Sequence, residues 1–296
     1  ALVRSTQVVG ELGAGMADRL GLPRGTPVVA GAGDNASAAV ALGLSADAVP
    51  VQGSVSLGTS GVVQVPIAVP RPDPQGRVHL FADALGGYLL LGVTLAAAGS
   101  LRWYRDTVAP IKSFAELLSL AAESTPSAGG VTFLPYLAGE RTPHMRADLR
   151  GSFQGLSLAT TAADMVRAVV QGVAYSLRDA LDVMRPLFSA GTGAGHDAPQ
   201  RFLATGGGAA SDMWLETLAT LFGVPVERPL GDDGAAHQVG AAEGAAMLAW
   251  RALGVTVDTS PPGRHVFEPS TAAADELESG YARYLELSRR AQEESR

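Results

Sequence analysis

Three glycine-rich turns, each beside a short run of apolar residues, place the strongest constraint on how this chain can fold. They lie at residues 31–34, 58–61 and 206–209. Glycine lets a backbone approach a ligand closely, and successive backbone N–H groups at such turns form sites for anions. Tight packing is the better explanation of one such turn alone. Three turns in one chain favour a ligand that carries phosphate.

The spacing of apolar residues predicts helices and strands along the whole chain. Thr161 and Asp164 resemble the capping box that starts a helix, and the apolar stripe that follows, as far as residue 184, predicts a long one. Residues 189–200 are expected to form a glycine-rich loop. We expect strands over 28–30, 51–57, 61–65, 88–93, 131–135 and 202–204, and further helices over 8–20, 36–42, 95–106, 114–123, 212–222, 241–253 and 274–290.

Several common fingerprints do not match the glycine turns. No lysine follows the glycines as in a P-loop, and no turn has the G-x-G-x-x-G pattern with an acidic residue about 20 positions later. Residues 54–58 miss the nucleophile-elbow pattern by its first glycine. The five histidines show no metal-ligand spacing, so we predict no metal-ligating residue. A P-loop, a dinucleotide fingerprint and a hydrolase triad are therefore not supported.

Charge and composition disfavour further classes of protein. A formal net charge of -7 would repel nucleic-acid phosphates, so nucleic acid is not expected as a partner. No apolar run approaches the roughly 20 residues that span a bilayer, so no membrane contact is expected. The chain has no cysteine, which rules out disulfides and thiolate zinc sites and fits a cytoplasmic location.

Asp34 stands where a glycine turn leads into an expected helix. For an arbitrary aspartate at such a place, capping of the helix is the better interpretation. The alternative is a general base that accepts the proton of a substrate hydroxyl during phosphoryl transfer. The residue alone does not decide between these two roles.

Five segments together resemble the FGGY family of carbohydrate kinases. Residues 133–144, Phe-Leu-Pro-Tyr-Leu-Ala-Gly-Glu-Arg-Thr-Pro-His, are similar to a segment typical of the xylulokinases within it. Residues 151–171 resemble the family signature. Residues 29–35 and 57–61 look like the catalytic-aspartate and phosphate-contact segments of the family, and residues 205–211 look like its adenosine motif.

The resemblance, from about Gly21 to about Ala249, implies an α/β protein with an actin-like (ribonuclease H-like) fold. In this fold a mixed sheet is flanked by helices, and ATP and sugar meet between two lobes. Residues 1–46 would be the tail of the N-terminal sugar-binding lobe, and residues 47–296 the C-terminal nucleotide-binding lobe. We expect the rest of the sugar-binding lobe to be missing from the chain, which places the activity of the chain by itself in doubt.

The resemblance also implies roles for single residues. Asp34 would deprotonate the sugar hydroxyl, and Asn35 would lie against the sugar. ATP and Mg²⁺ are the implied cofactors. Phosphoryl transfer needs positioning and charge stabilisation above all, so backbone amides, Mg²⁺ and one carboxylate can suffice. The residues implied to bind the nucleotide are Gly58, Thr59, Ala98, Gly99, Gly207, Gly208, Ser211 and Asp212.

The implied reaction is ATP-dependent phosphorylation of a ketopentose, D-xylulose to D-xylulose 5-phosphate, and residues 140–144 favour this sugar. A kinase for gluconate or another polyol is the enzymatic alternative. A non-catalytic nucleotide-binding module is the alternative from a different class. Surface left uncovered by the absent lobe predicts self-association, for instance as a homodimer. The polar segment 231–237 has no functional interpretation.

Overall fold

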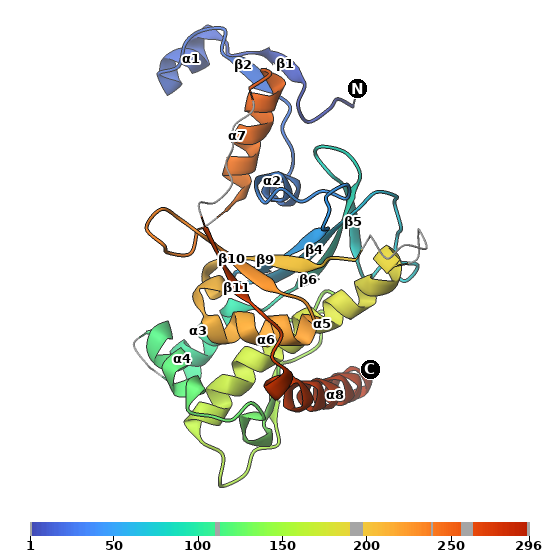
Figure 1. Ribbon diagram of the computed structural model, residues 1–296, viewed down its shortest axis with the longest axis vertical. Helices are drawn as coiled ribbons and strands as arrows, with labels where there is room; N and C mark the ends of the chain where they lie inside the picture. The colour runs from blue at the N-terminus through green and yellow to red at the C-terminus, as the bar shows by residue number, and fades with distance from the viewer. Residues whose placement is uncertain (1, 110–112, 190–197, 238, 256–262, 295–296) are drawn as a thin grey trace.

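A seven-stranded mixed β-sheet forms the centre of the protein, and helices cover both of its faces (Figure 1). The computed structural model describes residues 2–109, 113–189, 198–237, 239–255 and 263–294. The strands follow the order β11-β10-β9-β3-β4-β6-β5. Their bounds are β3 Gln52–Leu57, β4 Gly61–Ile67, β5 His79–Ala82, β6 Tyr88–Thr94, β9 Arg201–Thr205, β10 Val226–Leu230 and β11 Gly263–Phe267.

The connections between the strands explain the mixed directions of the sheet. Residues 58–60 form a short turn, so β3 and β4 run antiparallel, with Ser54 opposite Gln64. β9 pairs in parallel with both β3 and β10, and parallel neighbours need a long crossover connection. α6 (Asp212–Phe222) supplies this crossover between β9 and β10. The prediction of an α/β protein with a mixed sheet flanked by helices is confirmed.

The alternation of side chains along β3 and β4 separates the two faces of the sheet. Val55 and Val63 are fully buried in the larger core, whereas Gln64 faces α2 (Asp34–Ala41) on the other side. Figure 1 shows α2 and α7 on one face and the remaining helices of the body on the other. The bounds are α3 Ala98–Trp103, α4 Phe114–Ala122, α5 Ala162–Ser189, α7 Ala241–Ala252 and α8 Thr271–Glu294.

The long helix α5 forms the centre of the larger core. The backbone N–H of Asp164 donates to Thr161 Oγ1 at 3.2 Å, and the backbone N–H of Thr161 donates to Asp164 Oδ2 at 2.9 Å, which confirms the predicted capping box. Val166, Val169 and Val173 on the apolar stripe are fully buried. Each such side chain contributes about 1.5–3 kcal/mol relative to an exposed one, so this stripe anchors the sheet.

A smaller core lies under α2, where Ala39 and Leu42 meet residues of β6 and β9. α7 crosses α2 at Gly244, where any Cβ would overlap the backbone oxygen of Ser37. The contact therefore requires glycine and fixes α2 between α7 and the sheet. Since α2 begins at Asp34, this packing also fixes the start of the helix that carries the candidate base.

The N-terminal segment lies outside the body of the protein, at the top of Figure 1. The prediction of one helix over residues 8–20 is wrong there. β1 (Val8–Glu11) pairs antiparallel with β2 (Pro27–Val29), and α1 (Ala14–Leu20) starts only after the extended Gly13. The pairing of β1 with β2 therefore outweighs the helical spacing of the apolar residues.

A further small sheet completes the described fold. A two-stranded sheet joins β7 (Thr132–Leu134) to β8 (Ser152–Gln154). Of the loop expected over residues 189–200, residues 190–197 lie outside the described part of the chain. None of the helices in the described ranges is both long and apolar enough to cross a bilayer.

Candidate functional site

The turn between β3 and β4 is held by the start of α3. The backbone oxygen of Thr59 accepts the N–H groups of Ala97 at 2.9 Å and Gly99 at 3.2 Å, and the oxygen of Gly58 accepts that of Ala98 at 2.9 Å. A Cβ on Gly99 would lie 2.7 Å from the Thr59 oxygen, which is too close for an unstrained contact. Ala98 and Gly99 therefore shape this turn, and they use their backbone N–H groups to do so.

The turn after β9 packs against the same end of β3. Gly206 has a φ of +83°, and a Cβ there would lie 2.9 Å from the backbone nitrogen of Gly58. A Cβ on Gly208 would lie 2.7 Å from the Cβ of Leu57, whereas a Cβ on Gly207 would meet open space. Two of the three predicted glycine turns thus meet at the end of β3.

A pocket of about 340 Å³ opens beside these turns, between α3, α4 and the start of α6. Its walls are mostly apolar, and Trp214, 1% exposed, is one of them. Ser211 caps α6 by accepting the N–H of Trp214 at 3.3 Å. Apolar walls with a few polar groups fit a flat ring system such as a purine. The lining residues are Ala98, Leu101, Arg102, Phe114, Ala115, Leu118, Gly207, Gly208, Ala210, Ser211 and Trp214.

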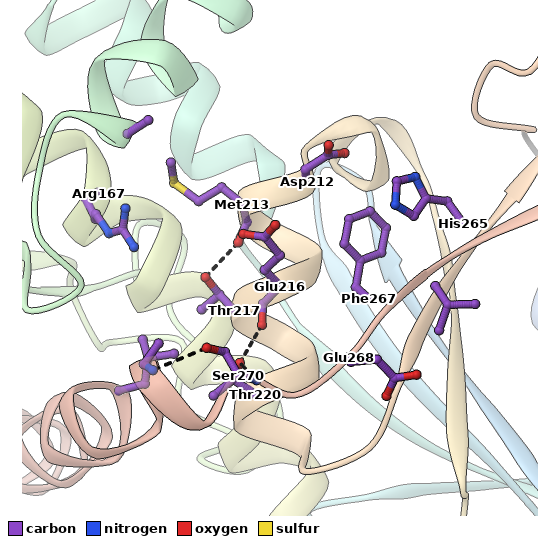
Figure 2. Close-up of a pocket in the computed structure, with 14 residues that line it drawn as sticks. Arg167, Asp212, Met213, Glu216, Thr217, Thr220, His265, Phe267, Glu268 and Ser270 are labelled. Atoms are coloured by element: carbon purple, nitrogen blue, oxygen red, sulfur yellow. Dashed lines mark hydrogen bonds between the residues drawn. The ribbon is translucent and has the colours of Figure 1, made fainter.

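Asp212 lines a different pocket, on the other side of α6. This second pocket has a volume of about 780 Å³, and Arg167, Glu216 and His265 also line it (Figure 2). The carboxylate of Asp212 accepts a hydrogen bond from Arg228 at 2.8 Å. Asp212 therefore lies outside the smaller pocket, although the preceding residue, Ser211, lines it.

Asp34 is the first residue of α2, and Gly33 is the N-cap residue. The side chain of Asp34 is exposed. Its Oδ1 accepts the backbone N–H of Asn35 at 2.8 Å and the side-chain amide of Asn35 at 3.2 Å. The carboxylate thus satisfies one of the free N–H groups of the first helical turn, where negative charge is favourable. The helix-end role fits this geometry, and the exposed carboxylate also remains open to a substrate.

Asn35 connects the start of α2 to the sheet. The side-chain amide of Gln64 donates to the backbone oxygen of Asn35 at 3.4 Å and to Oδ1 of Asn35 at 3.5 Å. The side-chain oxygen of Gln64 accepts the hydroxyl of Ser54 at 3.0 Å, and Ser54 lies on β3, which ends just before Gly58. Asp34 does not line the smaller pocket, which is built on the opposite face of the sheet. The structure therefore links Asp34 to the glycine turns through Gln64 and β3.

Residues 140–144 lie between β6, α5 and α8, with Glu140 and Thr142 buried and Arg141 exposed. Glu140 is 1% exposed. Its carboxylate accepts the backbone N–H groups of Leu95 and Arg141, each at 2.8 Å, and the hydroxyl of Ser176 at 3.2 Å. Burial raises the pKa of Glu140 to about 7. The segment supports the chain after β6, a role that no local sequence pattern indicates.

His144 and Asp179 lie beside Glu140 in a buried polar cluster. His144 Nε2 is 3.0 Å from the hydroxyl of Tyr136, 3.1 Å from that of Ser288 and 3.6 Å from Asp179 Oδ2. Burial lowers the pKa of His144 to about 4 and raises that of Asp179 to about 7, with the charge of Asp182 adding to the second effect. His144 is therefore neutral at pH 7, and its contact with Asp179 is not an ion pair there.

Residues 53–253 match the FGGY family of carbohydrate kinases, C-terminal domain. The matched range contains both glycine turns at the end of β3, the lining of the smaller pocket, and Glu140, His144 and Asp179 of the buried cluster. The chain belongs to the FGGY family of carbohydrate kinases. Kinases of this family transfer phosphate from ATP.

The chain is similar to named kinases over nearly its whole length. A xylulose kinase of Staphylococcus epidermidis is 39% identical over 290 residues, which are 96% of this chain and 55% of that protein. A crystal structure described as a xyloylose kinase from Brucella ovis has a TM-score of 0.81 at 35% identity. The match covers 97% of this chain and 56% of the Brucella ovis chain. The structure of a gluconate kinase from Lactobacillus acidophilus has a TM-score of 0.81 at 26% identity, and the match covers 96% of this chain and 56% of that kinase. The chain thus spans about half the length of the relatives it matches.

Proposed function

We propose that this chain is the nucleotide-binding part of a kinase that transfers the γ-phosphate of ATP to D-xylulose and yields D-xylulose 5-phosphate. The observation that carries the proposal is the meeting of the two glycine turns, at Gly58 and Gly206, beside one apolar pocket. The choice of sugar rests on the xylulose kinases among the relatives, such as that of Staphylococcus epidermidis. Residues 1–46 would belong to the sugar-binding lobe and residues 47–296 to the nucleotide-binding lobe.

The adenosine of ATP would occupy the smaller pocket, against Gly207, Gly208 and the cap residue Ser211. The terminal phosphates would then lie along the turn at Gly58 and Thr59. This orientation is favoured because the pocket and the turn share Ala98, which lines the first and binds the second. Backbone groups fixed in this way bind phosphate without any reorganisation at the moment of reaction.

Asp34 would act as the general base, with Asn35 against the sugar. The carboxylate takes the proton of the terminal hydroxyl, the oxygen bonds to the γ-phosphorus, and the bond between that phosphorus and the β,γ-bridging oxygen breaks to release ADP. The exposed side chain of Asp34 at the start of α2 is accessible to such a substrate. Its link to β3 through Asn35 and Gln64 gives it a fixed relation to the turn at Gly58 and Thr59, which we call the phosphate turn.

Mg²⁺ is the cation that we propose for the phosphates. The residues that the structure describes contain no group of three or more His, Cys, Asp or Glu side chains that could hold a metal. Mg²⁺ does not require such a group, because it is commonly bound by substrate phosphates and water with only one or two carboxylates. Bound to the phosphates, Mg²⁺ would neutralise part of their charge.

Phosphate transfer to a panel of sugars tests the proposal. The chain is assayed alone and fused behind the part of the Staphylococcus epidermidis xylulose kinase that it does not cover. ATP and one of D-xylulose, gluconate, glycerol or ribitol are supplied, and the phosphorylated sugar is measured. Because the fused part supplies most of the sugar-binding lobe, transfer to D-xylulose by the fusion tests whether this chain supplies the nucleotide-binding half. Failure to phosphorylate any of the four sugars would contradict the proposal. Preferred transfer to gluconate would favour the alternative of a gluconate kinase, which the similarity to the gluconate kinase from Lactobacillus acidophilus supports.

A non-catalytic nucleotide-binding module is the second candidate function. Exposed apolar side chains on the N-terminal segment, Val9 and Leu20 among them, support it as a surface for a partner or a second copy. Titration of the chain with ATP and Mg²⁺ separates the cases. Binding without transfer, even in the fusion, would establish the module, and light scattering of the chain alone reports whether it forms a homodimer.

A further inference from the structure

Glu140 lies in a loop that is fixed on both sides. The loop joins β7 to β8, and the backbone N–H and oxygen of Glu140 exchange hydrogen bonds of 2.8 Å with those of Arg146. The side chain then enters the interior, where it is 1% exposed. A carboxylate held in this way has a defined position, so the groups that it contacts are positioned in turn.

The carboxylate and its neighbour hold the chain where β6 ends. Glu140 Oε1 accepts the backbone N–H of Leu95 at 2.8 Å. Two residues later, the backbone N–H of Thr142 donates to the oxygen of Val93 at 2.8 Å, and Thr142 Oγ1 accepts the N–H of Val93 at 3.1 Å. The backbone on both sides of the last residue of β6 is therefore bound to this loop.

The segment after Leu95 leads directly to the phosphate turn. Ala97 and Gly99 donate their N–H groups to the oxygen of Thr59, and Ala98 donates to that of Gly58. Only one residue separates Leu95 from the first of these donors. A shift of Leu95 would consequently move the donors that set the conformation of the turn.

An ion pair does not account for Glu140. The contacts of its carboxylate in the described ranges are hydrogen bonds: Oε1 accepts the backbone N–H groups of Leu95 and Arg141, and Oε2 accepts the hydroxyl of Ser176 at 3.2 Å. A buried carboxylate is unfavourable unless hydrogen bonds compensate for its lost hydration. The backbone N–H groups of Leu95 and Arg141 supply that compensation. Because Arg141 is the next residue in the chain, the contact to Leu95 is the one that joins Glu140 to a distant part of the fold.

We infer that Glu140 is a positioning residue for the phosphates of the bound nucleotide, which it acts on through Leu95 and the turn at Gly58 and Thr59. This inference rests on the proposed nucleotide site and adds a residue that does not itself touch the ligand. It predicts that removal of the acceptor at position 140 weakens the binding of phosphates and leaves the binding of adenosine unchanged.

Calorimetric titration of the whole chain with ATP plus Mg²⁺, and separately with adenosine, tests this. Glu140→Leu removes the acceptor, Glu140→Asp withdraws it from Leu95 while the charge stays, and Glu140→Gln keeps a neutral acceptor in place. Ser176→Ala is the matched control, because it removes only the contact to Oε2. We expect Leu and Asp to lower the affinity for ATP about tenfold and Gln and Ser176→Ala to change it less than about twofold, with adenosine affinity constant throughout.

Three outcomes would overturn the inference alone. Equal losses for ATP and adenosine would show a general packing defect. An ATP affinity that Glu140→Leu leaves unchanged would show that Leu95 does not need the contact. If Glu140→Leu does not fold, the other two variants decide, and a larger loss for Gln than for Asp would make charge, and not position, the important property. Wild-type protein that binds neither ligand would overturn the proposed nucleotide site as well, which the first three outcomes do not.

Discussion

A Cβ on Gly99 would lie 2.7 Å from the backbone oxygen of Thr59, so α3 and the turn at Gly58 and Thr59 touch at a point where no side chain fits. Glycine inside a helix ordinarily costs about 1 kcal/mol relative to alanine. For Gly99→Ala we expect the opposite sign, a loss of about 1–3 kcal/mol in the free energy of unfolding, because the methyl group overpacks the contact. Affinity for ATP should fall with it.

Urea denaturation and ATP titration measure both effects of Gly99→Ala. Gly15→Ala is the matched control, since Gly15 also lies in a helix and a Cβ there meets open space. The control should be neutral or slightly stabilising. A Gly99→Ala protein more stable than the wild type would contradict the described contact.

The mouth of the smaller pocket offers a direct test of where the nucleotide binds. Ala115 is exposed on α4 and lines this pocket. Ala115→Trp should fill the space that we assign to the adenosine and lower the affinity for ATP more than about tenfold. Ser119→Trp, on the same helix but outside the pocket, should leave it unchanged. Equal affinities in the two variants, measured by calorimetry, would place the nucleotide elsewhere.

Asp179 should make stability depend on pH. Burial raises its pKa to about 7, whereas an unfolded aspartate ionises near about 3.9. The folded protein therefore binds more protons between these values, so the stabilising contribution is present below about pH 4 and lost as the pH rises through about 7. Asp179→Asn cannot ionise, and its free energy of unfolding at pH 8 should exceed that of the wild type by about 1–3 kcal/mol.

Urea denaturation at pH 5, 6, 7 and 8 measures this difference. His144, whose pKa is lowered to about 4, contributes with the opposite sign between about pH 4 and about pH 6.5, but it is present in both proteins. The difference between the two curves therefore isolates Asp179. Parallel curves across this range would show that Asp179 is not the buried acid described here.

The strands that were not predicted from the sequence show where local sequence patterns are not informative. Residues Val226–Leu230 contain Glu227, Arg228 and a proline, so their pattern does not predict a buried strand. In the fold, Glu227 pairs with Arg201 on β9 at 3.2 Å and with Arg264 on β11 at 2.8 Å. These pairs join positions far apart in the sequence, and they make the polar strand β10 possible. The strands β3, β4, β6 and β9, in which apolar residues alternate with other residues or follow one another, were predicted.

The candidate site divides in a similar way. The glycine turns could be predicted because glycine itself marks a close backbone approach, and the turns at Gly58 and Gly206 do meet. The contact of Glu140 with Leu95 joins positions 45 residues apart, and no local pattern encodes it. The roles of Asp34 and of the residues around the pocket stay predictions until the chemistry is measured.

Phosphate transfer by Asp34→Asn tests the central claim most directly. The measurement compares turnover of ATP and D-xylulose, together with ATP affinity, in the fusion protein with and without the substitution. Asp47→Asn, an exposed aspartate beyond the other end of α2, serves as the control. We predict that Asp34→Asn lowers turnover at least about 100-fold while ATP affinity and the control stay unchanged. Near-normal turnover in Asp34→Asn would contradict the role of Asp34 as the base.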